Sequence, residues 1–149
     1  MVLLRKTVPA DRELLFEWAN DPETRNMSIN GKPITWENHQ VWFDRKLLDE
    51  NTKMFILSDE ETNIGQVRFE WKDSEWLIGY SIVKEFRGRG LGKQILLAGI
   101  EQIEKGKITG YVKPENLASV KIFTDLGFAE EETSEQNGVI LIKFSLVKS

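Results

Sequence analysis

The sequence predicts a mixed α/β fold in which a mostly antiparallel sheet is flanked by helices. Two observations support this prediction. Over residues 53–83, short apolar runs alternate with turns, which is typical of antiparallel strands. From residue 90 onward, apolar side chains at helical spacing alternate with short apolar runs, which is the pattern of strands connected by helices. A chain of 149 residues suits a single domain over residues 1–149.

The first 50 residues predict an edge strand and two helices. Residues 2–6 form the strand. The first helix starts at Asp11, a residue type that caps helices, and it stops at residues 20–22, because the residue before a proline disfavours helical backbone angles. Thr35 caps the second helix, whose side chains at positions 36, 40, 43 and 47 fall at helical spacing.

The other strands and helices follow along the chain. We expect strands at 53–58, 66–71, 76–83, 108–113 and 139–144, and helices at 90–105 and 116–126. In residues 76–83 both the odd-numbered and the even-numbered positions are largely apolar. Because these positions face opposite sides of a sheet, we expect this strand to be buried on both faces. Gly106 and Gly127 are placed to end the two helices.

Composition excludes several functional classes. The chain has no cysteine, which rules out a disulfide framework, a thiolate nucleophile and a cysteine-ligated zinc. The net charge of −4 gives no indication of nucleic-acid binding. The first apolar run is too short for a signal peptide, and no run reaches membrane-spanning length. We therefore expect a cytoplasmic protein without a nucleic-acid or membrane partner.

Glycines at positions 88, 90 and 92 lie between a predicted strand and a predicted helix. Such a turn presents free backbone N–H groups at the positive end of the helix dipole, which suits a phosphate or pyrophosphate. A nucleotide P-loop does not fit, because Lys93 is followed by Gln94, and the glycine spacing does not match the dinucleotide fingerprint. A tight turn without a ligand is the alternative interpretation.

Two segments resemble the motifs of the GNAT N-acetyltransferase superfamily. Arg87-Gly88-Arg89-Gly90-Leu91-Gly92 matches its Arg/Gln-x-x-Gly-x-Gly/Ala signature. About thirty residues on, Asn116-Leu117-Ala118-Ser119 and the segment 123–128 are similar to its second motif. The predicted order of strands and helices is also similar to this fold over nearly the whole chain.

The resemblance implies an acetyl-coenzyme A-dependent N-acetyltransferase that needs no metal. Its amine acceptor attacks the thioester directly. The preceding strand would hold the pantetheine arm and offer a backbone amide near Tyr80 to the oxyanion. The residues implied in cofactor binding are Tyr80, Ser81, Ile82, Val83, Arg87, Gly88, Arg89, Gly90, Leu91, Gly92, Lys93, Asn116 and Phe123. Asn116 also suits the cap of the following helix.

The sequence identifies the catalytic acid and base less clearly than it identifies the cofactor-binding residues. The second motif usually has a tyrosine that protonates the leaving thiolate, but this chain has Phe123 there. Ser119, a water molecule or unassisted release could replace it, and a coenzyme A-binding module without turnover is the alternative. Glu75 ranks first and Glu70 second as the catalytic base.

The sequence of the first two predicted helices indicates which acceptor the protein uses. Their sequence looks like that of acetyltransferases acting on UDP-linked 4-amino sugars in pseudaminic-acid and related surface-glycan pathways, and more loosely like ribosomal-protein N-terminal acetyltransferases. Trp18 could stack on a base or sugar, Arg25 could pair with a diphosphate, and His39 could bind a hydroxyl or phosphate. Structural roles for all three are the alternative. The expected partner is a small-molecule amine, bound by a monomer or homodimer.

Overall fold

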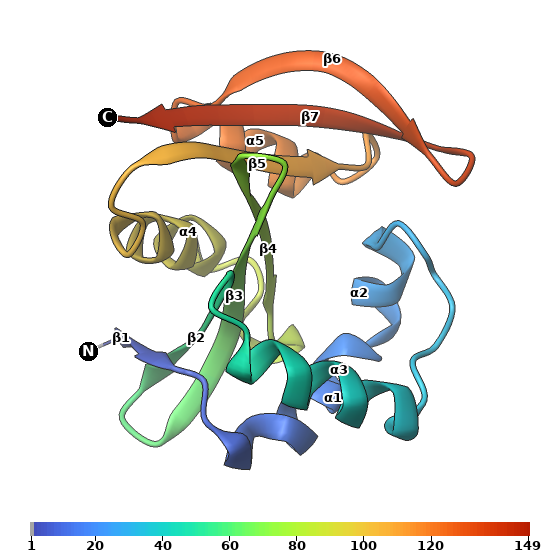
Figure 1. Cartoon of the computed structure of the whole chain (residues 1–149), viewed down its shortest axis with the longest axis vertical. Coiled ribbons are helices and arrows are strands. Elements are labelled where there is room, and N and C mark those ends of the chain that lie inside the picture. The colour runs from blue at the N-terminus through green and yellow to red at the C-terminus, as the bar shows by residue number, and fades with distance from the viewer. Residues whose placement is uncertain (1) are drawn as a thin grey trace.

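The described part of the chain forms one seven-stranded sheet, with strand order β1-β2-β3-β4-β5-β7-β6. The structure, a computed structural model, describes residues 2–149. The strands are β1 Val2–Lys6, β2 Thr52–Asp59, β3 Thr62–Lys72, β4 Glu75–Ile82, β5 Gly106–Val112, β6 Ala129–Gln136 and β7 Val139–Lys148. Only β4 and β5 pair in parallel (Figure 1). The predicted mixed, mostly antiparallel α/β fold is confirmed.

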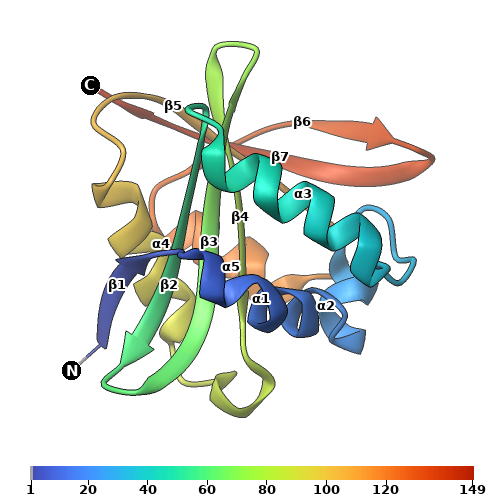
Figure 2. The same ribbon diagram turned by 60° about the horizontal axis from the view of Figure 1, so that its bottom comes forward.

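Helices cover both faces of the sheet (Figures 1 and 2). They are α1 Arg12–Ala19, α2 Pro22–Met27, α3 Trp36–Leu48, α4 Leu91–Glu101 and α5 Leu117–Asp125. The alternation of strand side chains creates two cores. Phe55 and Leu57 of β2 join the core beneath α4 and α5, whereas Met54 and Ile56 join the core beneath α1 and α3.

Strands β4 and β5 diverge soon after they meet. They pair at Trp76 with Ile108 and at Leu77 with Thr109, and in Figure 1 β5 runs across the direction of β4. The expectation that residues 76–83 are buried on both faces was wrong, because only Ile82 is buried and the others are half-covered. The sheet therefore has an opening between β4 and β5, and α4 and α5 begin just after these two strands end.

Three local predictions differ from the structure. Helix α2 was not expected, although Asp21 caps it and Pro22 occupies its first position, which are ordinary start signals. Strand β6 was missed because its acidic sequence has no apolar alternation, and it is held by pairing with β7. Helix α4 stops at Glu101, so Gly106 does not end it and instead begins β5 with a φ of 120°.

Asp11 lies at the start of α1, but its side chain does not cap the helix. It is 6% exposed and accepts hydrogen bonds from Arg5 Nη1 and Nη2 at 2.8 and 2.9 Å, and from the Val8 backbone N–H at 2.8 Å. Burial raises the pKa of Asp11, but the bonds from Arg5 and Val8 outweigh it and hold this pKa below its ordinary value. The residue thus ties α1 to the edge strand β1.

This depressed pKa predicts a loss of stability in acid. The Asp11 ion pair stabilises the fold above the unfolded pKa of about 3.9, and this contribution disappears as pH falls through the lower folded pKa. In urea unfolding, we expect Asp11→Asn to lower the unfolding free energy at pH 6, and we expect the difference from the wild type to shrink below about pH 4. A difference that stays constant down to acid would contradict this role.

Candidate active site

The turn between β4 and α4 has an unusual backbone. Gly88 and Gly90 have φ angles of 79° and 76°, in the left-handed region that glycine adopts without strain. A Cβ built on either would meet nothing within 4 Å, so both glycines border open space. Gly90 caps α4, whose first N–H groups lack intrahelical acceptors. This combination forms a cradle for an anion.

Gly92 has a different role. A Cβ at this position would come within 2.9 Å of Ile122 Cδ1 in α5 and 3.5 Å of Tyr80 Cε2. The third glycine therefore permits close packing of α4 on α5 and β4.

The three cations of the glycine turn are not equivalent. Arg87 forms ion pairs with Asp21 at 2.8 Å and Glu23 at 2.6 Å, and it donates to the Ile82 carbonyl. It thus ties the turn to α2, and its charge is neutralised there. Arg89 and Lys93 are exposed and supply the remaining positive charge beside the cradle.

A cavity of about 340 Å³ lies where α1 and α2 face the end of β4. Trp18 lines it from α1, and Ser81, Ile82 and Val83 line it from the strand. At the closed end of the opening, Thr109 Oγ1 is buried without a hydrogen-bond partner in residues 2–149. The site thus combines an open strand edge, a glycine cradle and a buried hydroxyl without a hydrogen-bond partner. This combination fits an extended, phosphorylated ligand such as acetyl-coenzyme A.

Tyr80 extends from β4 to the first turn of α5. Its hydroxyl lies 2.6 Å from Ser119 Oγ. Burial raises the pKa of Tyr80, and the hydrogen bond with Ser119 lowers it to a smaller degree, so the phenol keeps its proton at neutral pH. Asn116 Oδ1 accepts the Ser119 backbone N–H at 3.3 Å, so this asparagine caps α5.

Phe123 lies in the core and is 2% exposed. Its ring stacks on Phe144 with centroids 5.5 Å apart, and its Cζ would lie 2.7 Å from a Cβ on Gly110. The residue holds α5 on β5 and β7.

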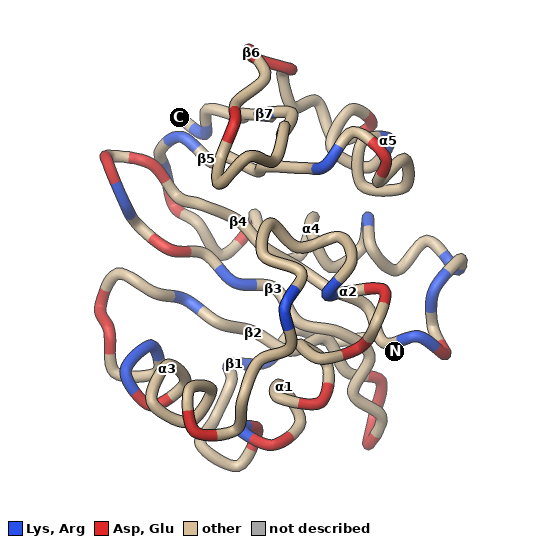
Figure 3. Tube along the Cα trace, turned by 90° about the vertical axis from the view of Figure 1, so that its right-hand side faces the viewer, with Lys and Arg blue, Asp and Glu red and all other residues tan. Residues whose placement is uncertain are grey.

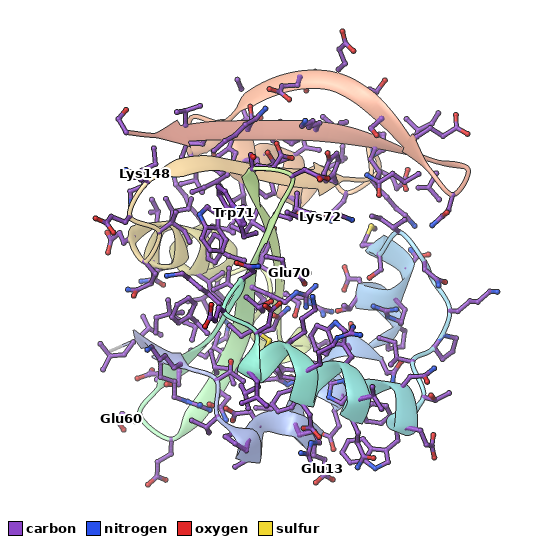
Figure 4. All side chains as sticks on the ribbon, in the orientation of Figure 1. Glu13, Glu60, Glu70, Trp71, Lys72 and Lys148 are labelled. Atoms are coloured by element: carbon purple, nitrogen blue, oxygen red, sulfur yellow. The ribbon has the colours of Figure 1, made fainter. Side chains whose placement is uncertain are left out.

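Both carboxylates proposed as bases are ion-paired. Glu75 begins β4, and its carboxylate lies 3.8 Å from Lys107 Nζ. Glu70 lies on β3 opposite Leu77, where the opening begins, and it contacts Lys46 at 3.1 Å and Arg68 at 2.7 Å. Figure 4 shows Glu70 between α3 and the layer formed by β5 and β7. Of the two, Glu70 lies closer to the opening.

The side chains of Arg25 and His39 contact backbone carbonyls of the protein itself. Arg25 donates to the Ala19, Asn30 and Lys32 carbonyls and thereby fixes the segment between α2 and α3. His39 is 3% exposed, packs among four aromatic rings and places Nε2 2.7 Å from the Arg12 carbonyl. Burial lowers the pKa of His39, so the ring is neutral at pH 7.

Arg68 was not predicted from the sequence. Its guanidinium carbon lies 5.0 Å from the centre of the Trp42 ring, and its Nη2 lies 3.6 Å from the position of a Cβ on Gly79. It therefore lies over the open stretch of β4, on the face toward α3. In the sequence, Arg68 is one of the polar residues that alternate with apolar ones over residues 66–71. This alternation does not indicate its contacts, because Trp42 and Gly79 are distant in sequence. Charges of both signs are interspersed on the side of the molecule in Figure 3.

Comparison with known proteins places the chain in one family. The family model for the acetyltransferase (GNAT) domain matches residues 1–129. The chain is 24% identical to an uncharacterized Methanocaldococcus jannaschii protein over 91% of its own length, but it spans only 30% of that protein. It is 27% identical to the N-acetyltransferase 9-like protein of Nematostella vectensis, covering 86% of this chain and 74% of that one. The chain belongs to the GNAT acetyltransferase family.

A solved structure agrees with this assignment. The spermidine N-acetyltransferase of Vibrio cholerae, in complex with CoA and spermine, superposes with a TM-score of 0.85 at 16% identity, over 99% of this chain and 95% of that one. The family match and this superposition therefore agree on a GNAT acetyltransferase fold. Residues 2–149 contain no group of three or more metal-ligating side chains, and none of the helices described is long and apolar enough to cross a membrane.

Proposed function

We propose that the protein transfers the acetyl group of acetyl-coenzyme A to a primary amine on a small molecule that also carries negative charge. A nucleotide-linked amino sugar is the class of acceptor that fits. The observation that carries this proposal is the position of Arg68 over the open stretch of β4. Its Nε faces Glu70 at 2.7 Å and its planar group packs on Trp42. Residues 2–149 offer no other partner to its terminal nitrogens, so they are available to an oxyanion.

A second guanidinium lies close enough to Arg68 to interact with it. Burial lowers the pKa of Arg25, and the charge of Arg68 lowers this pKa further. Two like charges near one another in a partly buried site attract an anion, because the anion relieves their repulsion. Arg25 thus supports anion binding through its field while its donors hold backbone carbonyls.

Other acceptor classes have less support from these residues. A polyamine such as the spermine bound to the Vibrio cholerae enzyme needs carboxylates that are free to pair with it. Here Glu70, which lies on β3 opposite the start of the opening, is already paired with Lys46 and Arg68. A protein N-terminus remains the alternative acceptor and is one outcome of the test below.

The same geometry supports a mechanism for the transfer. The acceptor amine approaches on the α3 face, and the thioester lies in the opening between β4 and β5. Backbone N–H groups of β4 beyond Leu77 are not paired with β5 and can donate to the carbonyl oxygen as negative charge develops on it. Alignment of the two substrates supplies much of the remaining acceleration.

Arg68→Gln should lower kcat/KM for an anionic acceptor by about 10- to 100-fold, because hydrogen bonds to a charged group contribute about 1.5–3 kcal/mol. The assay measures thiol release from acetyl-coenzyme A with four acceptors: a UDP-linked 4-amino sugar, the same amino sugar without the nucleotide, spermidine, and a peptide with a free N-terminus. We expect the UDP-linked sugar to be preferred by the wild type.

Arg45→Gln is the matched control, since it removes the same charge from an exposed position on α3. It should leave all four rates within about twofold of the wild type. Preference for the peptide or for spermidine in the wild type, or an equal effect of both substitutions, would contradict the anionic acceptor.

A further inference from the structure

The hydrogen bond between Tyr80 and Ser119 bridges the opening in the sheet. Tyr80 belongs to β4 and Ser119 to α5, which packs on β5 through Phe123. The open stretch Ile78–Ile82 is about 16 Å long at the usual rise per residue, and Tyr80 lies at its centre. A ligand that runs through the opening must therefore pass this hydroxyl pair.

The surroundings of the pair favour negative charge on a neighbouring atom. Ser119 lies in the first turn of α5, and the Tyr80 hydroxyl lies 4.0 Å from a Cβ built on Gly92 in the first turn of α4. The positive ends of two helix dipoles thus flank the hydroxyls. Ser119 is 7% exposed, so bulk water does not surround the pair.

Acetyl transfer leaves a charge that must be neutralised. When the amine nitrogen bonds to the carbonyl carbon, the carbon–sulfur bond breaks and its electron pair stays on sulfur. Protonation of that sulfur by a positioned acid accelerates its departure. Phe123 has no proton to give, and in residues 2–149 it is enclosed by Gly110 and Phe144.

We propose that Tyr80 is the acid that protonates the departing sulfur of coenzyme A, and that Ser119 is a positioning residue that holds the Tyr80 hydroxyl in the opening. The O–H bond of Tyr80 breaks as the S–H bond forms. Ser119 donates a hydrogen bond to the resulting phenolate. The acceptor ammonium loses two protons over the cycle, and through water one restores Tyr80 while the other enters solvent. This inference rests on the acetyl transfer itself and does not depend on the acceptor being anionic.

The protonation state of Tyr80 suits this role. Because burial raises its pKa, the phenol is fully protonated at pH 7 and available as a donor. The flanking helix dipoles stabilise the phenolate that forms transiently.

Tyr80→Phe removes only the hydroxyl. We expect kcat to fall by about 100-fold, the lower end for a general acid, with KM for acetyl-coenzyme A and calorimetric affinity for coenzyme A within about twofold of the wild type. Ser119→Ala should lower kcat by about 10-fold, and Ser119→Thr, which keeps the hydroxyl, should restore most of it. Thr124→Ala, which removes an exposed hydroxyl from the same helix, is the control and should not change kcat.

A second measurement does not depend on turnover. The absorbance of the coenzyme A thiolate reports the thiol pKa of the bound product. A hydrogen bond from Tyr80 stabilises that thiolate, so Tyr80→Phe should raise the pKa of the bound thiol by about one pH unit. A bridge that is only structural would lower the melting temperature of Tyr80→Phe without moving this pKa.

The outcomes separate this role from the overall activity. Thiol release is measured with the amine panel and with water alone as acceptor. If Tyr80→Phe keeps kcat within about twofold, or loses only coenzyme A affinity, Tyr80 is not the acid. If Tyr80→Phe does not fold, Ser119→Ala decides, because unchanged kcat and thiol pKa in that variant would also overturn the proposal. Wild-type protein that releases no thiol would instead contradict acetyl transfer.

Discussion

Gly90→Glu should weaken acetyl-coenzyme A binding by at least about 100-fold. The substitution places a carboxylate beside the pyrophosphate. Two like charges about 4 Å apart repel by about 1 kcal/mol in bulk water and by about 4 kcal/mol near a protein surface. It also forces a residue with a Cβ into a φ of 76°, which costs about 1–2 kcal/mol. Calorimetry with coenzyme A measures the affinity directly.

Gly138→Glu separates the effect on the site from backbone strain. Gly138 has a φ of 79° in the β6–β7 turn, and a Cβ there would also meet nothing within 4 Å. The two variants should lose similar unfolding free energy, but only Gly90→Glu should lose coenzyme A binding. Native affinity in Gly90→Glu would refute the anion cradle at the start of α4.

Phe123→Ala should lower the free energy of unfolding by about 3–5 kcal/mol, which is the usual cost of removing a buried aromatic ring. The ring is almost completely buried and packs against Phe144, Phe128 and Gly110. For the same reason, Phe123→Tyr should be destabilised, because its added hydroxyl would extend toward the Gly110 backbone. Urea unfolding at pH 7 provides both values.

Leu117→Ala is the control for the stability loss in Phe123→Ala, because Leu117 is on the same helix but 74% exposed. We expect it to change the unfolding free energy by less than about 0.5 kcal/mol. A small loss in Phe123→Ala, similar to that in Leu117→Ala, would mean that Phe123 is not part of the core. Higher turnover in Phe123→Tyr would restore this position as a candidate for the catalytic acid.

Features that depend on local backbone chemistry could be predicted from the sequence. A few neighbouring residues specify each of three features: the glycine turn, the helix cap at Asn116 and Gly127, the glycine that follows the end of α5. In the sequence of β3, apolar Val67 and Phe69 alternate with polar residues, and both apolar side chains are buried in the structure. Two of these features, the glycine turn and the cap at Asn116, belong to the predicted cofactor site.

Other features depend on contacts between distant segments. Tyr80 and Ser119 are 39 residues apart, and no periodicity predicts that their hydroxyls meet. The hydrogen bonds from Arg25 to backbone carbonyls before and after α2 likewise depend on the path of the chain, which no sequence pattern predicts. The opening between β4 and β5 was also missed, because two apolar strands look fully buried whether or not they stay paired.

Hydrogen exchange with and without coenzyme A tests the central claim most directly. The claim is that the opening between β4 and β5 and the glycine turn together hold acetyl-coenzyme A. It predicts that coenzyme A protects amides in residues 78–83 and 88–93, while the β6–β7 hairpin remains unchanged. Tight binding without protection in these two segments, or with protection elsewhere, would contradict it.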